Sequence, residues 1–242
     1  MKQIAKADRW FSFKGIRNTA MHVAMTSMPT RPLPAAKGEL LAVPGMNGKL
    51  WQPEDAFDRV NVSLALYTED NADIDEVCAW LSGEGDLVFG DEPDKAYHAR
   101  ITKEFSRNHQ NARFYNQTMT PSFDCEPFRY ESNPADPISI TTSGTAITNI
   151  GTIASAPLLV VSGSGDGTLM IGSSTMIFTG MPSSGMTIDC DAKFAYTGSG
   201  TTRVLATQYI TGDWIEIGTG TQRVTFSGGI TGVTITPRWR WL

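Results

Sequence analysis

Alternation of apolar and polar residues predicts β-strands along most of the first half of the chain. Over residues 59–67, valine and leucine occupy every second position and polar or small residues fill the gaps. This is the period of a strand with one face in solvent. Over residues 96–105, the same period turns Tyr97 inward and His98 outward. The strands expected in this half are residues 9–16, 59–67, 86–90, 96–105 and 112–127.

One segment of this half has a helical period instead. Four apolar residues from Ile74 to Leu81 follow the i, i+3, i+4, i+7 spacing of a single helical stripe. Asp73 can accept hydrogen bonds at the first turn, with Glu76 three residues later as in a capping box. Gly83 lies where a helix ends. The sequence therefore predicts one helix here.

A long irregular excursion interrupts the strands at residues 18–56, which contain five prolines. Two turn signals lie inside it, Pro44-Gly45 and Asn47-Gly48. Long excursions in compact domains are usually functional or disordered. We expect a hairpin over residues 40–51 that projects from the domain body.

The second half contains short apolar runs at strand-and-turn spacing and no helical period. This pattern is typical of an antiparallel β-sandwich with two sheets. The Gly- and Ser-rich residues 162–168 are interpreted as a tight hairpin turn, because no helix follows to bind phosphate and Asp166 is the one carboxylate available to calcium. The expected strands are residues 138–142, 157–161, 167–171, 175–178, 185–190, 193–196, 203–210, 213–217, 223–226 and 234–239.

Composition changes sharply at residues 133–137, NPADP. The 34 charged residues and 7 glycines before this point give way to 11 charged residues and 16 glycines after it. Prolines fix their own φ and keep the preceding residue extended, so the segment is a stiff connector. We therefore expect two domains, residues 1–133 and 134–242.

Charge and apolar content exclude several classes of protein. The net charge of −5 argues against non-specific nucleic-acid binding, which needs clustered Lys and Arg. No apolar run is long enough to span a bilayer, and no secretory signal is expected at the start. Cys78, Cys125 and Cys190 form no CxxC pair and are expected to be buried apolar residues of a protein made in a reducing compartment.

Candidate catalytic groups are few. The chain has no P-loop, no GxSxG and no HExxH, and its three histidines have no metal-site spacing. Asp189 and Asp191 share one face of a predicted strand, where they could perform acid–base chemistry or belong to a solvated face. The terminal PRWRW could stack on bases or sugars, but its period favours a strand with Trp239 and Trp241 inward. No catalytic, cofactor-binding or metal-binding residue is assigned.

Several segments, taken in order, resemble the distal tail protein of siphovirus-type phages. They are WFSFKGI (10–16), VPGMNG (43–48), WLSGEGDLVF (80–89), YHAR (97–100), FDCEPFRY (123–130), NIGT (149–152), IDCD (188–191) and TPRW (236–239). The resemblance covers nearly the whole chain. One departure is Met46, where such proteins often carry a basic residue.

The resemblance implies a mainly β protein without enzymatic activity or cofactor. Its N-terminal domain, with one helix, would be related to tail-tube proteins and close into a hexameric ring, and its C-terminal domain would be a galectin-like β-sandwich. Its partners would be further copies of itself, the tail tube protein and the tail-associated hub or fibre protein, at the virion tail tip, after assembly in the bacterial cytoplasm. The ring would let DNA pass without binding it specifically, and no membrane is involved. The subunit-contact hairpin would include Pro44, Gly45, Asn47 and Gly48.

Two rival functions follow from other residues. A carbohydrate-binding adhesion protein would use an exposed aromatic, for which Trp214 beside Asp213 and Glu216 is the best candidate. A hydrolase would use the carboxylate pair Asp189 and Asp191.

Overall fold

The computed structural model describes residues 9–111 and 114–242, which form two compact units. The first unit consists of residues up to Asn133 together with Leu242, and the second is Pro134–Trp241. Antiparallel sheets build both units, and the one α-helix of the described residues lies in the first. The predicted mainly β fold class is confirmed. Within those ranges no helix is long and apolar enough to cross a membrane.

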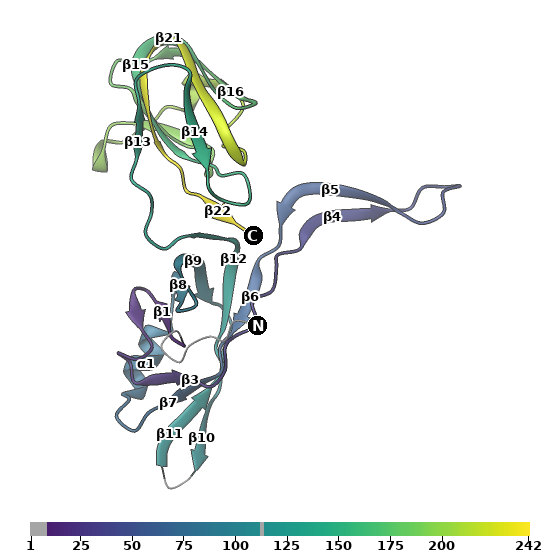
Figure 1. Cartoon of the computed structure of the whole chain (residues 1–242), viewed down its shortest axis with the longest axis vertical. Coiled ribbons are helices and arrows are strands. Elements are labelled where there is room, and N and C mark those ends of the chain that lie inside the picture. The colour runs from purple at the N-terminus through teal and green to yellow at the C-terminus, as the bar shows by residue number, and fades with distance from the viewer. Residues whose placement is uncertain (1–8, 112–113) are drawn as a thin grey trace. The chain divides into compact units, whose positions relative to one another are not determined.

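Two antiparallel sheets and a separate hairpin form the first unit (Figure 1). In the larger sheet the order is β2-β1-β8-β9-β12, with β6 also paired to β12. The smaller sheet has the order β10-β11-β7-β3. Their bounds are β1 Phe11–Phe13, β2 Ile16–Arg17, β3 Val23–Met25, β6 Val60–Ser63, β7 Leu66–Thr68, β8 Glu84–Phe89, β9 Glu92–Ile101, β10 Arg107–Asn111, β11 Phe114–Met119 and β12 Ser122–Glu131.

Helix α1, Ile74–Trp80, begins where the capping pattern predicts. The Asp73 carboxylate accepts hydrogen bonds from the backbone N–H groups of Asp75 and Glu76, at 3.0 and 3.1 Å. Val77 is fully buried, and the Trp80 indole N–H donates to the carbonyl of Phe13 at 2.9 Å. The helix is thereby fixed to the first strand of the larger sheet.

Three predicted strands of the first unit are each two strands in the structure. Residues 9–16 form a hairpin, because Lys14 and Gly15 both adopt positive φ between β1 and β2. Residues 59–67 divide into β6 and β7, which belong to different sheets. Residues 112–127 divide into β11 and β12 next to Pro121, and residues 112–113 lie outside the described part. Alternation correctly predicted the buried side chains Val60, Val62, Leu64 and Leu66, but it carries no signal for a change of sheet.

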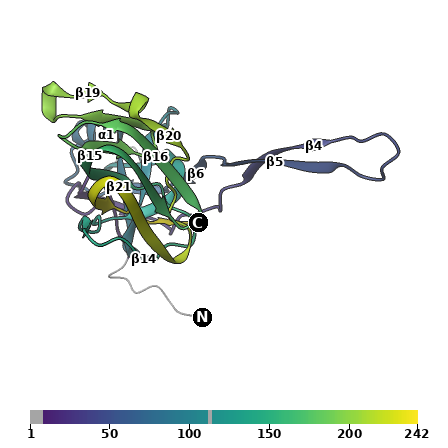
Figure 2. The same ribbon diagram turned by 90° about the horizontal axis from the view of Figure 1, so that it is seen from above.

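Strands β4, Ala36–Leu41, and β5, Leu50–Phe57, form a hairpin that we call the arm, residues 36–57. Among the described residues they pair only with each other. In Figures 1 and 2 the arm stands away from the rest of the first unit. The projecting hairpin expected over residues 40–51 is therefore present, and it is longer than the prediction.

The second unit is a β-sandwich whose central pair is β15, Leu158–Ile171, with β21, Gly220–Thr236. Its core includes Leu159, Val161, Leu169 and Trp239. The other strands are β13 Ile138–Ile140, β14 Thr145–Asn149, β16 Ser174–Met181, β17 Met186–Asp189, β18 Phe194–Thr197, β19 Val204–Leu205, β20 Ile210–Gly212 and β22 Arg240–Trp241.

The hairpin turn predicted at residues 162–168 is wrong, because β15 runs through this segment. Ser162 pairs with Gly232 and Gly167 with Gly228, across register shifts on either side of Gly163. The glycines serve close backbone approach. A Cβ on Gly229 would lie 1.7 Å from the Ser164 carbonyl oxygen, and one on Gly163 would lie 2.1 Å from the Gly229 carbonyl oxygen. Glycine here permits two bulged strands to stay paired.

Four further strand predictions in this unit need correction. Residues 223–226 and 234–239 were expected as two strands, but the first and most of the second belong to the single strand β21. The strand expected at 203–210 is broken by the 3-10 turn Thr207–Tyr209, and the one at 213–217 is reduced to the isolated bridge Ser155↔Ile217. A second 3-10 turn, Gly200–Thr202, precedes β19. Short apolar runs do not show whether a segment pairs along its length.

Candidate subunit interface

The arm exposes large apolar side chains over most of its length. Leu40 and Trp51 are 56% and 46% exposed, although such residues usually lie in a core. Several exposed large apolar side chains on one projecting element indicate a site of protein contact. The other large apolar side chains exposed on the arm and its tip are Leu41, Val43, Met46 and Leu50.

Strand register determines which apolar groups share a face of the arm. Leu40 pairs with Trp51 and Gly38 with Pro53, so these four lie on one face. The Trp51 indole lies against the Gly38 backbone, since a Cβ on Gly38 would be 2.5 Å from Trp51 Cζ2. The absence of a side chain at Gly38 thus lets the indole pack against the backbone, on the apolar face of the arm.

The four residues of the predicted contact hairpin, Pro44, Gly45, Asn47 and Gly48, lie together in the loop at the arm tip. Gly45 and Gly48 have φ of 80° and 88°, values that favour glycine. A Cβ on either would meet no atom within 4 Å, so the turn geometry requires the glycines. Their contact with another subunit stays a prediction.

Apolar and polar contacts attach the root of the arm on its exit side, where the chain leaves β5 at residues 57–59. The rings of Phe57 and Phe128 meet edge to face with centroids 5.5 Å apart. The Asp58 N–H donates to the Ala35 carbonyl at 2.9 Å and joins the two sides of the arm. The Arg59 guanidinium then binds Asp124 of β12, with Nε donating to Oδ1 at 2.9 Å.

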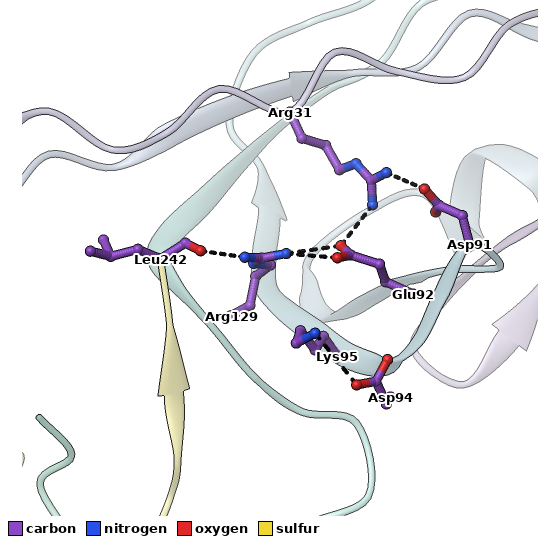
Figure 3. A network of polar contacts seen from close by, with 7 residues as sticks. All are labelled: Arg31, Asp91, Glu92, Asp94, Lys95, Arg129 and Leu242. Atoms are coloured by element: carbon purple, nitrogen blue, oxygen red, sulfur yellow. Dashed lines mark hydrogen bonds and ion pairs between the residues drawn. The ribbon is translucent and has the colours of Figure 1, made fainter. Parts of the chain in front are cut away.

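An ion-pair network attaches the entry side of the arm, the segment that leads into β4 (Figure 3). Arg31 donates from Nη1 to Oε2 of Glu92 at 3.1 Å and from Nη2 to Oδ2 of Asp91. Arg129 on β12 donates from Nη1 to both oxygens of the same Glu92, at 3.1 and 2.9 Å. We call Arg31, Asp91, Glu92 and Arg129 the anchor network. Side-chain exposures of 14–34% put these pairs partly out of solvent, where charges interact more strongly than on an open surface.

Both carboxylates of the proposed hydrolase pair are paired with arginines. Asp189 binds Arg238 through two bonds of 2.8 and 2.9 Å, and Asp191 binds Arg240 at 2.5 Å. Burial would raise the pKa of Asp189, but hydrogen bonds from Arg238 and from two backbone N–H groups hold it below its ordinary value. Asp189 is therefore an ionised structural group, which disfavours general-acid chemistry at this pair.

Trp214, the candidate glycan contact, is half-buried and packs against the core of the second unit. Its role in glycan binding stays a prediction. Trp239 is buried in the same core, and Trp241 packs against it, as the alternating period of the terminal segment predicts. All three tryptophans therefore have a packing role in the core of the second unit.

His98 lies on the outer face of the larger sheet of the first unit, as alternation predicts. Its Nδ1 lies 2.6 Å from Oδ1 of Asp86, and its ring stacks on Tyr130 with centroids 4.3 Å apart. The hydrogen bond with His98 lowers the pKa of Asp86 below its ordinary value. A hollow of about 320 Å³ beside this pair also includes Arg59, Glu84 and Arg100. Across the described ranges, no group of three His, Cys, Asp or Glu side chains could hold a metal ion.

No family model matches this chain, and no curated protein matches it. The fold does match the crystal structure of the SPP1 Dit protein, described as a paradigm of the hub adsorption apparatus in phages that infect Gram-positive bacteria. The TM-score is 0.70 at 15% sequence identity, and the match covers 96% of this chain and 99% of that one. The two proteins share one fold. The resemblance drawn from the sequence is thereby confirmed at the level of fold, over both units.

Sequence reasoning found the tip of the arm but missed the residues that attach it. Pro-Gly and Asn-Gly are local signals for a turn. Arg31 and Glu92 are 61 residues apart, and no spacing in the sequence relates them. The one available signal was an arginine between prolines in an otherwise weakly patterned segment.

Proposed function

We propose that this chain is a structural protein of a phage tail tip that assembles into a ring, with six copies as the expected number. The observation that carries the proposal is the fold shared with a phage hub protein over nearly the full length of both chains. The ring would link the tail tube to the tail-associated hub or fibre protein and support host attachment. Assembly would take place in the bacterial host cytoplasm.

The arm supports this proposal physically. A monomer that held its arm in water would expose Leu40 and Trp51 on one face and Leu41 and Leu50 on the other, which is costly unless other surfaces cover them. A contact between an arm and a different surface of the next copy is heterologous, and such contacts close into rings when the rotation allows. The free backbone edge of β4 can add to a neighbouring sheet.

A non-enzymatic role agrees with the chemistry. Both carboxylates of the candidate pair are paired to arginines, and the sequence contains no P-loop, GxSxG or HExxH motif. A mildly acidic ring, at −5 per chain, would let DNA pass through its channel without retaining it.

Native mass spectrometry and negative-stain electron microscopy of the purified full chain test the proposal. We expect a closed ring of six copies with a central pore, and a double variant L40S/W51S that stays monomeric. The matched control V204S/L205S removes two exposed apolar side chains, 63% and 64% exposed, from β19 of the second unit. A wild-type chain that stays monomeric at every concentration, or a control as defective as the arm variant, would count against the arm-mediated ring.

A further inference from the structure

The direction of the arm is not fixed by the hydrophobic core. Core residues of the first unit lie up to Val23 and resume at Val60, and among the described residues none of the core lies between them. The arm and both its connections to the unit fall in this interval. Thr26 is still held to the unit, since its N–H and hydroxyl donate to the Ala65 carbonyl at 2.9 and 3.1 Å. Without other contacts the hairpin would turn freely at residues 27–35 and 58–59, because a two-stranded ribbon alone has no third layer to hold it.

Both connections reach the same irregular segment of β12. Cys125 pairs with Ala99 and Arg129 with Tyr97, so β12 advances by four residues while β9 advances by two. Such a bulge re-aims the side chains that follow it. Phe128 within the bulge receives Phe57 from the exit side, and Arg129 at its end holds Glu92. The bulge therefore carries the contacts that attach both sides of the arm to the first unit.

The entry side depends on one guanidinium. Residues 31–34 help to line a hollow of about 290 Å³, together with Asp91 and Arg129, so this stretch is not closely packed along its whole length. Leu33 itself is 78% exposed. Arg31 spans the hollow, since its two nitrogens bind Asp91 and Glu92 and its guanidinium lies 5.1 Å from the centre of the Phe89 ring.

We propose that Arg31 is the positioning residue that fixes the direction of the arm. Its planar fork bridges the two carboxylates that close the β8–β9 turn, and Arg129 connects one of them to the β12 bulge. Pro29, Pro32 and Pro34 stiffen the chain on both sides of Arg31, so that fixing this side chain fixes the entry to β4. The use of a fixed arm in assembly rests on the proposed function, but the fixed direction itself is a property of the single chain.

Pulsed electron paramagnetic resonance on the full chain tests the direction of the arm. One nitroxide label is placed at the arm tip by Asn47→Cys and the other on the native, half-buried Cys78 of α1, while the buried Cys125 and Cys190 stay unlabelled. We expect one narrow distance distribution in the wild-type background. In Arg31→Met the distribution should widen by about twofold or more, because the arm samples many directions.

The matched control is Arg17→Met. The Arg17 guanidinium also lies over an aromatic ring, 4.1 Å from the centre of Trp10, but Arg17 lies on the edge strand β2 and is not part of the anchor network. Arg17→Met should leave the distance distribution between the two labels unchanged. Arg31→Lys should restore only part of the order, since an ammonium cannot bridge two carboxylates as a fork. An Arg31→Met distribution as narrow as that of the wild type, at the same mean distance, would overturn the proposal.

A measurement on the labelled chain with Arg31 in place protects against a variant that does not fold. In about 1 M salt the screening length falls to about 3 Å. Because the anchor side chains keep 14–34% of their surface in solvent, their ion pairs weaken, and the distance distribution should widen, though less than in Arg31→Met. An unchanged wild-type distribution in high salt would contradict the proposal.

Assembly distinguishes this inference from the proposed function. If about one tenth of Arg31→Met arms point correctly, the concentration for half-maximal ring formation rises about tenfold. A wild-type chain that forms no ring would refute the proposed function while the spin-label comparison still decides the role of Arg31.

Discussion

Replacing Gly229 with alanine should unfold the centre of the second unit locally, although alanine adds one methyl group. Gly229 lies on β21 opposite the bulged part of β15, and its Cβ would lie 1.7 Å from the carbonyl oxygen of Ser164 and 3.3 Å from that of Asp166. Both are backbone atoms, which cannot swing away as the end of a side chain can. The two longest strands of the sandwich would have to separate.

The expected cost follows from this geometry. Overpacking a well-ordered interior costs roughly 1–3 kcal/mol when side chains can adjust. Because a backbone carbonyl cannot adjust in this way, we expect Gly229→Ala to cost about 3 kcal/mol or more. The matched control is Gly232→Ala on the same strand, where the nearest atom is the Ile140 carbonyl oxygen at 3.3 Å. There we expect a change within about 0.5 kcal/mol, because a small displacement suffices and the unfolded chain loses some freedom.

Hydrogen exchange of the full chain in increasing denaturant, followed by mass spectrometry of peptides, measures the effect in each unit. In Gly229→Ala, peptides of β15 and β21 should exchange at a lower denaturant concentration than in the wild type, while peptides of the first unit keep their protection. If residues 162–168 formed a hairpin turn instead, Gly229 would face no backbone and alanine would be tolerated. Equal stability of Gly229→Ala and Gly232→Ala would therefore refute the continuous strand.

Three further predictions concern single side chains. Asp189→Asn should lower the stability of the second unit by about 1–2 kcal/mol at neutral pH, measured by denaturant unfolding. The pKa of Asp189 is depressed in the folded chain. Its contribution to the free energy of unfolding is therefore present above the unfolded pKa of about 3.9 and is lost as the pH falls through the folded pKa. Asp189→Asn should lose that part of the acid sensitivity of the wild type. Asp73→Ala should lower the stability of the first unit by about 1 kcal/mol, because α1 loses its cap. Hydrogen exchange should become faster in α1 peptides alone, and unchanged exchange in those peptides would contradict the prediction. Burial raises the pKa of Cys125 and Cys190 to about 12, so in the native chain a maleimide at neutral pH should modify Cys78 alone, and intact mass should show one adduct.

Local signals in the sequence predicted those features that depend on local geometry. Asp73 caps α1 because its carboxylate reaches N–H groups two and three residues away, and such spacing is visible in the sequence. Gly45 and Gly48 mark the arm tip because a tight turn needs positive φ. Alternation identified the buried residues Val60 and Val62, since strand geometry places every second side chain on the same face.

The tertiary structure alone decided how segments meet. Glycines at 163 and 229 look like turn residues, yet they allow two distant strands to approach, and a sequence pattern does not distinguish the two uses. The division of residues 59–67 between two sheets depends on which strands lie beside them. Arg31 became a candidate for positioning the arm only when folding brought it to Asp91 and Glu92, because an ion pair between residues 61 positions apart leaves no periodic trace. The sequence thus determined the elements and the tip of the arm, whereas its mounting on β12 was decided by contacts between segments far apart in the chain.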